Sequence, residues 1–113
     1  MIALYPEVIE NIHRLSLSGP LNASRAEDIV RQFQTISWEG ADSVIVDLAD
    51  VPFIDGQGLA ALIAGYKTFG SDQQRFQVVG PQTQARLLFR LTGYDKLFHP
   101  TAAVMAAPAH RPR

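Results

Sequence analysis

The sequence predicts a single α/β domain with a mixed, mostly parallel sheet of roughly four or five strands and with helices packed mainly on one face. Short β-branched and aliphatic runs alternate along the chain with longer segments of helical periodicity, which indicates parallel strands joined by right-handed crossovers. If consecutive strands are neighbours, all crossover helices lie on the same face of the sheet. The alternation of apolar and polar residues over 13–18 agrees, because it is typical of a strand with one covered face.

Two strands and a long helix are predicted in the first third of the chain. Residues 2–9 are apolar but include Pro6, which lacks a ladder donor, so this segment is expected to be an edge strand. The strand at 13–18 follows it. A helix is predicted over 22–36, because Asn22 is a favourable N-cap and Ser24 to Glu27 have the spacing of a capping box. An apolar stripe that must face the sheet supports this helix: Ala26, Ile29, Val30, Phe33 and Ile36.

The stretch 44–69 is predicted to form the centre of the fold. Its first residues, VIVDL, form an interior strand that should lose its pairing near Pro52. A helix over 57–69 follows almost at once, with Asp55 as its cap. The residues that fall on one face of this helix are Leu59, Leu62, Ile63, Tyr66 and Phe69.

The C-terminal part contains one further strand and one further helix. The strand is predicted over 76–79 and the helix over 82–92, with Gly93 as the residue after the helix end. The predicted apolar face of this helix consists of Ala85, Leu87, Leu88 and Leu91.

The end of the chain is predicted to be less regular. Leu97 and Phe98 could form a last short strand, and residues 101–107 one or two helical turns. The domain is therefore expected to span residues 1–107, with a disordered tail at 108–113.

Composition excludes several classes of function. The chain has 113 residues, no cysteine and a net charge of -1, so disulfides, thiolate zinc sites and cysteine nucleophiles are excluded and a cytoplasmic location is expected. Lys and Arg are scattered, which argues against nucleic acid as a partner. No apolar run reaches the roughly 18 residues of a membrane span, and we expect neither export nor membrane insertion.

The turn before the central helix is the predicted functional site. Gly56 and Gly58 let the backbone turn without Cβ clashes, and the first N–H groups of the helix collect there with the positive end of its dipole. Such a turn suits an anion or the acceptor groups of a partner.

Two alternatives assign chemistry to the same region. Residues 56–61, GQGLAA, fit the short dinucleotide fingerprint, but the following strand ends in Val79-Gly80-Pro81 without the acidic residue that holds a ribose. Asp47, Asp50 and Asp55 could act as catalytic acids or bases, although a turn residue and a helix cap are simpler interpretations of the last two. We therefore predict no catalytic residue, no metal site and no cofactor.

Several motifs resemble those of the STAS domains, the family of anti-sigma factor antagonists and of cytoplasmic domains of sulfate transporters. The resemblance covers about residues 12–100 and rests on these segments: Leu17 to Asn22, Val46 to Leu48, Phe53 to Asp55, Gly58-Leu59, Val78 to Pro81 and Leu91 to Tyr94. It implies the predicted fold, and a non-catalytic, partner-switching module that regulates transcription in bacteria.

The resemblance also implies where a partner binds. In antagonists of this kind the serine that follows the aspartate of the turn is phosphorylated by a partner that is both kinase and anti-sigma factor. This chain has Gly56 at that position, so it cannot be switched off there and is expected to bind constitutively. The expected partner-binding residues are Asn22, Ser24, Asp55, Gly56, Gln57, Gly58 and Leu59.

Three functions remain open. The favoured partner is an anti-sigma factor or a related serine kinase-like ATPase, bound by a monomer or weak dimer of this chain. The alternative is an accessory subunit of a lipid or anion transporter, because similar domains accompany such transporters. A small nucleotide-binding domain comes third.

Overall fold

Strands and helices alternate over residues 12–92, as predicted. The computed structural model describes residues 3–9 and 11–98. Along these residues the elements are β1 (Ala3–Ile9), β2 (Ile12–Ser18), α1 (Ala23–Trp38), β3 (Ser43–Asp50), α2 (Gly56–Thr68), β4 (Phe76–Val79), α3 (Thr83–Thr92) and α4 (Asp95–Phe98). The predicted helices agree with α1, α2 and α3 to within two residues at each end.

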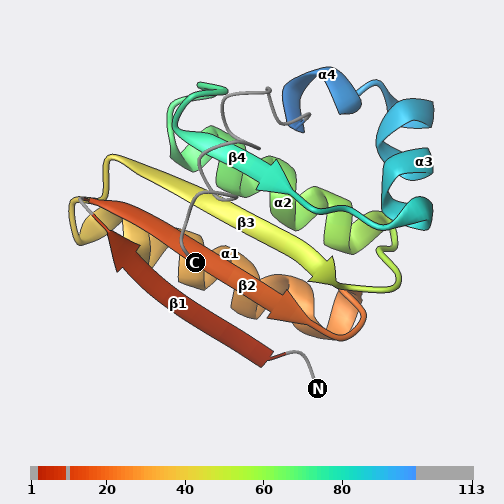
Figure 1. The fold of residues 1–113 in the computed structure, drawn as a ribbon, viewed down its shortest axis with the longest axis horizontal. Coiled ribbons are helices and arrows are strands. Elements are labelled where there is room, and N and C mark those ends of the chain that lie inside the picture. The colour runs from red at the N-terminus through yellow and green to blue at the C-terminus, as the bar shows by residue number, and fades with distance from the viewer. Residues whose placement is uncertain (1–2, 10, 99–113) are drawn as a thin grey trace.

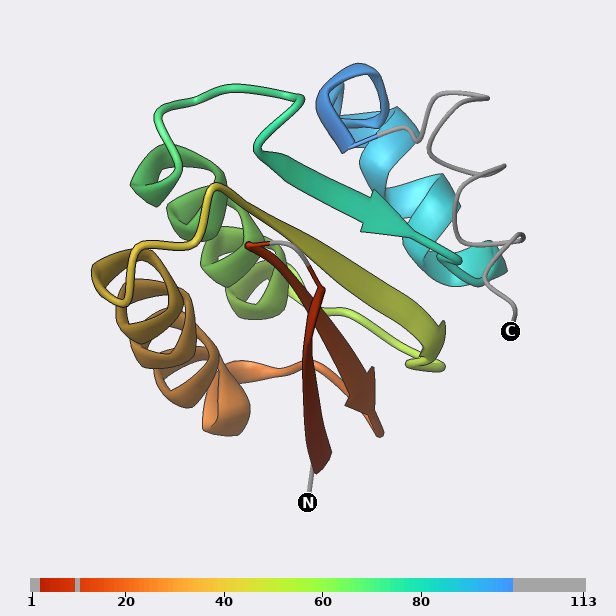
Figure 2. The same cartoon turned by 60° about the vertical axis from the view of Figure 1, so that its left-hand side comes forward.

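The four strands form one sheet in the sequential order β1-β2-β3-β4. β1 is antiparallel to β2, whereas β2, β3 and β4 are parallel, as predicted for a mixed, mostly parallel sheet. β1, which contains Pro6, lies at an edge, and β3 lies inside the sheet. Figures 1 and 2 show α1 and α2 together on one face of the sheet, with α3 and α4 on the β4 side.

The core lies between the sheet and these two helices. Leu15, Leu17, Val44, Val46 and Leu48 of the two inner strands are fully buried on the covered face. They meet the predicted α1 stripe, in which Ile29, Phe33 and Ile36 are buried. This apolar layer explains why the two periodicities in the sequence predicted the fold.

An aromatic cluster joins the sheet to three helices. The ring of Phe76, from β4, lies 5.2 Å from that of Phe33, 5.8 Å from Phe98, 6.3 Å from Tyr66 and 6.4 Å from Phe69. Two of these contacts are edge-on and two are tilted, and aromatic quadrupoles favour such arrangements over face-to-face stacking. β4 is short, so this cluster supplies much of its attachment to the helices.

The prediction of a last short strand at Leu97 and Phe98 is wrong. These residues belong to α4, in which both backbone N–H groups donate to the carbonyl oxygen of Tyr94, at 3.0 and 2.9 Å. The ring of Phe98 stacks on Tyr94 and enters the aromatic cluster, so packing favours the helical turn over strand pairing. The helical turns expected at 101–107 and the tail expected at 108–113 lie outside the described residues.

The predicted apolar face of α3 is half wrong. Ala85 is buried and Leu88 packs against the core, but Leu87 and Leu91 are 49% and 75% exposed. Phe89 takes the inward position instead, with its ring 5.3 Å from Phe98. The helix ends as predicted, at Gly93 in the left-handed conformation (φ 82°).

Candidate partner-binding site

Two loops meet beyond the ends of β2 and β3. Leu21 and Ile54 form an isolated parallel bridge, in which Leu21 N–H donates to Phe53 O at 2.9 Å and Asp55 N–H donates to Leu21 O at 3.2 Å. Gly19 N–H donates to Asp50 O at 3.0 Å. These bonds continue the pairing of the two strands across the loops, so the start of α1 lies beside the start of α2.

The carboxylate of Asp55 joins the two helix starts. Its Oδ1 accepts from Gly58 N–H at 2.8 Å, which is the predicted cap of α2. Its Oδ2 accepts from Ala23 N–H at 3.3 Å, in the first turn of α1. A carboxylate of the chain itself therefore occupies one of the donors at the start of α2 that the sequence offered to an external anion, and it also binds a donor at the start of α1.

Asn22 caps α1 as predicted, but the capping box does not form. Asn22 Oδ1 accepts from Ser24 N–H at 3.2 Å and from Ser24 Oγ at 2.7 Å. Ser24 thus lies inside the first turn of the helix rather than at its cap, and the side chain of Glu27 is 87% exposed.

The two glycines of the turn differ sharply. A Cβ on Gly58 would lie 2.2 Å from Leu21 O, so no side chain fits between α2 and the loop before α1. A Cβ on Gly56 would meet nothing within 4 Å, and this residue does not have the positive φ that favours glycine. The fold therefore requires glycine at position 58 and accepts a side chain at position 56.

The same geometry argues against a dinucleotide site. In the fingerprint, the second glycine lets a pyrophosphate approach the helix start. Here Leu21 O occupies that side of Gly58, and the negative charge of Asp55 lies at the helix start. The second glycine of the match, Gly58, thus reflects tight packing of two loops.

The predicted partner-binding residues fall into three groups. Ser24, Gly56 and Gln57 are exposed, and Asn22 and Asp55 are half-buried. Gly58 and Leu59 are buried, so they can only position the turn. Binding by the exposed residues stays a prediction.

Two features of the site had no signal in the sequence. The side-chain amide of Gln84, from α3, donates to Ile54 O at 2.9 Å and accepts from Ile54 N–H at 2.8 Å, as a neighbouring strand would. Phe53, next to the turn, is 47% exposed. The first contact links residues 30 positions apart, and local patterns do not report such contacts.

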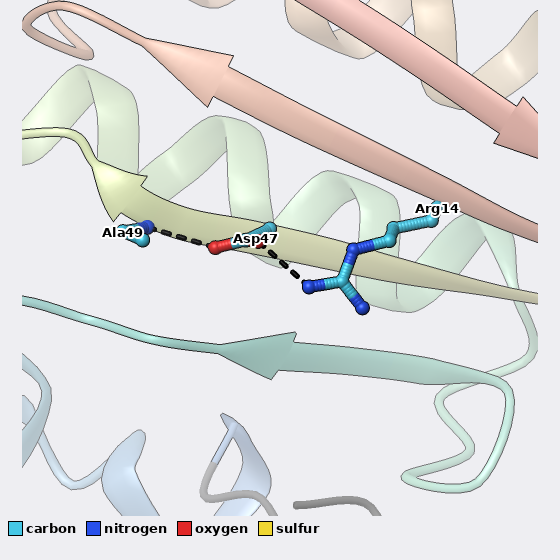
Figure 3. A network of polar contacts seen from close by, with 3 residues as sticks. All are labelled: Arg14, Asp47 and Ala49. Atoms are coloured by element: carbon cyan, nitrogen blue, oxygen red, sulfur yellow. Dashed lines mark hydrogen bonds and ion pairs between the residues drawn. The ribbon is translucent and has the colours of Figure 1, made fainter. Parts of the chain in front are cut away.

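The candidate catalytic carboxylates have structural roles or lie apart. Figure 3 shows Asp47 on the open face of the sheet, where Oδ2 pairs with Arg14 Nη2 at 2.7 Å and Oδ1 accepts from Ala49 N–H at 2.9 Å. Asp50 is exposed at the end of β3. Within residues 3–9 and 11–98, no group of three or more His, Cys, Asp or Glu side chains could hold a metal ion. None of the helices described is long and apolar enough to cross a membrane.

Replacing Asp55 with alanine should lower the free energy of unfolding by about 2 kcal/mol, because it leaves N–H groups of both helix starts without their acceptor. Asp55→Asn keeps one oxygen acceptor and should lose about half as much. Urea unfolding measures both. Asp50→Ala, which changes an exposed aspartate five residues earlier, is the control; equal losses for Asp55→Ala and Asp50→Ala would contradict the bridging role.

The comparison with known families agrees with this architecture. The profile of the STAS domain family matches residues 4–107, which is most of the chain. The chain belongs to the STAS domain family. This STAS domain is 22% identical over 90 residues to an anti-sigma-B factor antagonist of Staphylococcus epidermidis, and the match covers 80% of this chain and 83% of the relative.

Solved structures share the fold over nearly the whole length of this STAS domain. An anti-sigma factor antagonist from Mycobacterium paratuberculosis superposes with a TM-score of 0.80 at 27% identity, covering 98% of this chain and 95% of that one. SpoIIAA of Bacillus, in its unphosphorylated form, gives a TM-score of 0.77 at 18% identity, and the match covers 98% of each chain. The family and the fold predicted from the sequence are thus confirmed.

Proposed function

We propose that this STAS domain is a non-catalytic regulatory module that binds a protein partner through the joined loops around Asp55. The observation that carries the proposal is the bridge of Asp55 between two helix starts, which holds the exposed residues Ser24, Gly56 and Gln57 on one rigid surface. A rigid surface loses little conformational freedom on binding, which favours affinity. The relatives named anti-sigma-B factor antagonist and the solved antagonist at 27% identity support a partner-switching role.

The partner in this proposal is an anti-sigma factor or a related serine kinase-like ATPase, and binding is constitutive. Gly56 has no hydroxyl group, so it cannot accept a phosphoryl group. The negative charge that phosphorylation adds, which would block docking, therefore cannot arise at this position. The fold does not need glycine at this exposed position, since a Cβ would meet nothing within 4 Å. Backbone geometry therefore does not explain why position 56 lacks a phosphorylatable hydroxyl group, which favours a functional explanation.

Gly56→Asp is expected to weaken binding of the co-purified partner by about tenfold or more, which is about 1.4 kcal/mol. The new carboxylate adds bulk, charge and a desolvation cost at the centre of the proposed surface. An acidic residue is favourable in the first turn of a helix, so the melting temperature should be retained. Calorimetric titration and thermal unfolding separate the two effects.

Gln73→Asp is the control for this experiment, because Gln73 is exposed in the loop that follows the opposite end of α2. Unchanged affinity of Gly56→Asp relative to this control would remove the turn from the docking surface. Co-purification of a transporter ATPase or permease, instead of a kinase-like ATPase, would point to the transporter role.

Gly56→Ser should create a phosphorylation site that the natural chain lacks. After incubation with a kinase of the anti-sigma type, mass spectrometry should detect phosphate at position 56 of the variant and none on the turn of the wild type. High occupancy on Ser24, Thr68 or Ser71 of the wild type would contradict constitutive binding and indicate that regulation uses another hydroxyl.

A further inference from the structure

The outward side of α3 carries an apolar surface that the fold does not use. Leu87 and Leu91 are one helical turn apart, and they are 49% and 75% exposed. The inward side is complete without them, because Ala85 and Phe89 are buried and Leu88 packs against the core. Exposed leucines therefore remain on a helix whose own packing is satisfied.

Two arginines lie beside these leucines. Arg86 and Arg90 are exposed and also one turn apart, so the four side chains form one surface, which we call the α3 outward face: Arg86, Leu87, Arg90 and Leu91. No acidic residue occurs from Thr83 to Thr92. Across residues 11–98 neither arginine takes part in an ion pair, whereas Arg31 of α1 pairs with Glu27 and Asp28 of its own helix. The charge of this face is thus available to a partner.

The α3 outward face is held rigidly. The amide of Gln84 makes two hydrogen bonds with the backbone of Ile54 at one end of the helix. At the other end, Tyr94 N–H donates to Phe89 O at 2.8 Å as the chain turns at Gly93. A fixed helix that presents leucines and arginines at i, i+4 spacing is preorganised to meet a second helix.

We propose that the α3 outward face docks an acidic amphipathic helix of a protein partner. Carboxylates one turn apart on that helix would pair with Arg86 and Arg90, while apolar residues between them would cover Leu87 and Leu91. Residues 99–113 contain no Asp or Glu, so that segment of the chain cannot supply the carboxylates. An anionic membrane or nucleic acid fits less well, because each calls for a broad basic surface and the Lys and Arg residues of this chain are scattered rather than clustered.

Nuclear magnetic resonance titration of the ¹⁵N-labelled full chain tests this proposal. The probe is a synthetic amphipathic peptide with Glu and Leu each repeated at i, i+4, and a scrambled peptide of the same composition is the comparison. We expect chemical-shift changes concentrated on residues 86–91 with the patterned peptide only. The affinity should fall as salt rises from about 0.05 to about 0.5 M, since exposed ion pairs are screened.

Two variants of the face should lose this binding. Arg90→Glu and Leu91→Asp are each expected to lower the affinity for the patterned peptide by about tenfold. Lys67→Glu is the matched control, because Lys67 is an exposed basic residue on another helix and its reversal should leave affinity unchanged. Gly56→Asp should also leave it unchanged, which separates this surface from the turn of the proposed function.

Several results would overturn the proposal. Equal binding of the scrambled peptide, shifts located away from α3, or unchanged affinity of Arg90→Glu and Leu91→Asp would each do so. Sedimentation of the wild type as a dimer that Leu91→Asp converts to a monomer would identify a second copy as the occupant. Co-sedimentation with vesicles of anionic lipid, lost in Arg90→Glu, would identify a membrane surface instead.

Discussion

Gly58→Ala is expected to lower the free energy of unfolding by about 3 kcal/mol, the upper part of the usual range for overpacking a tight site. The new Cβ would lie 2.2 Å from Leu21 O and 2.9 Å from Leu21 C. These are backbone atoms, so no rotamer change can relieve the clash. The start of α2 would have to withdraw from the loop before α1, which weakens the bond from Asp55 N–H to Leu21 O.

Gly56→Ala is the matched control, two positions earlier in the same helical turn. Its Cβ would meet nothing within 4 Å, and alanine favours the helix, so stability should be unchanged or higher by up to about 1 kcal/mol. Urea unfolding of the two variants gives the comparison. Similar stabilities would mean that the close approach of the two loops does not constrain the fold.

Phe76→Ala is expected to cost about 4 kcal/mol, the usual loss for removing a fully buried aromatic ring. Phe76 is 0% exposed and contacts aromatic rings of α1, α2 and α4 as well as Phe69. Its removal leaves a cavity surrounded by rings on separate elements, which cannot all close in together. The cavity should also loosen β4 and α4, which the cluster holds together.

Phe53→Ala serves as the control, since this ring is 47% exposed beside the turn. We expect a loss below about 1 kcal/mol. Chemical unfolding monitored by far-ultraviolet circular dichroism measures both variants. A loss for Phe76→Ala no larger than that for Phe53→Ala would contradict the central role of the aromatic cluster.

The conformations of α1, β3 and α2 could be predicted from the sequence because their signals are local. Asn22 and Asp55 are favourable caps, and the hydrophobic periodicity of the segments that follow reports which face is buried. Parallel pairing then followed from the alternation of strands and helices, and the handedness of crossovers placed the helices between neighbouring strands on one face. The family resemblance rested on residues of β2, β3, α2, β4 and α3 and of the loops beside them.

The sequence also identified the turn at Asp55, but not how the turn is built. The second hydrogen bond of this carboxylate, to Ala23 N–H, joins residues 32 positions apart. The difference between Gly56 and Gly58 depends on one atom, Leu21 O, that approaches only in the folded chain. A local pattern contains both glycines and cannot distinguish them.

The C-terminal helices were decided by tertiary packing. Leu87 and Leu91 match a helical stripe as well as Ala85 and Phe89 do, so periodicity alone permits either pair to face inward. Phe89 faces inward because its ring contacts that of Phe98. The same packing favours the helix α4 over the strand predicted at the end of the chain. The sequence by itself determined the order and type of the elements from β1 to α3, because backbone propensity and apolar periodicity are local. Only the tertiary structure decided which side of α3 is buried and which is exposed, because that choice depends on contacts between distant residues.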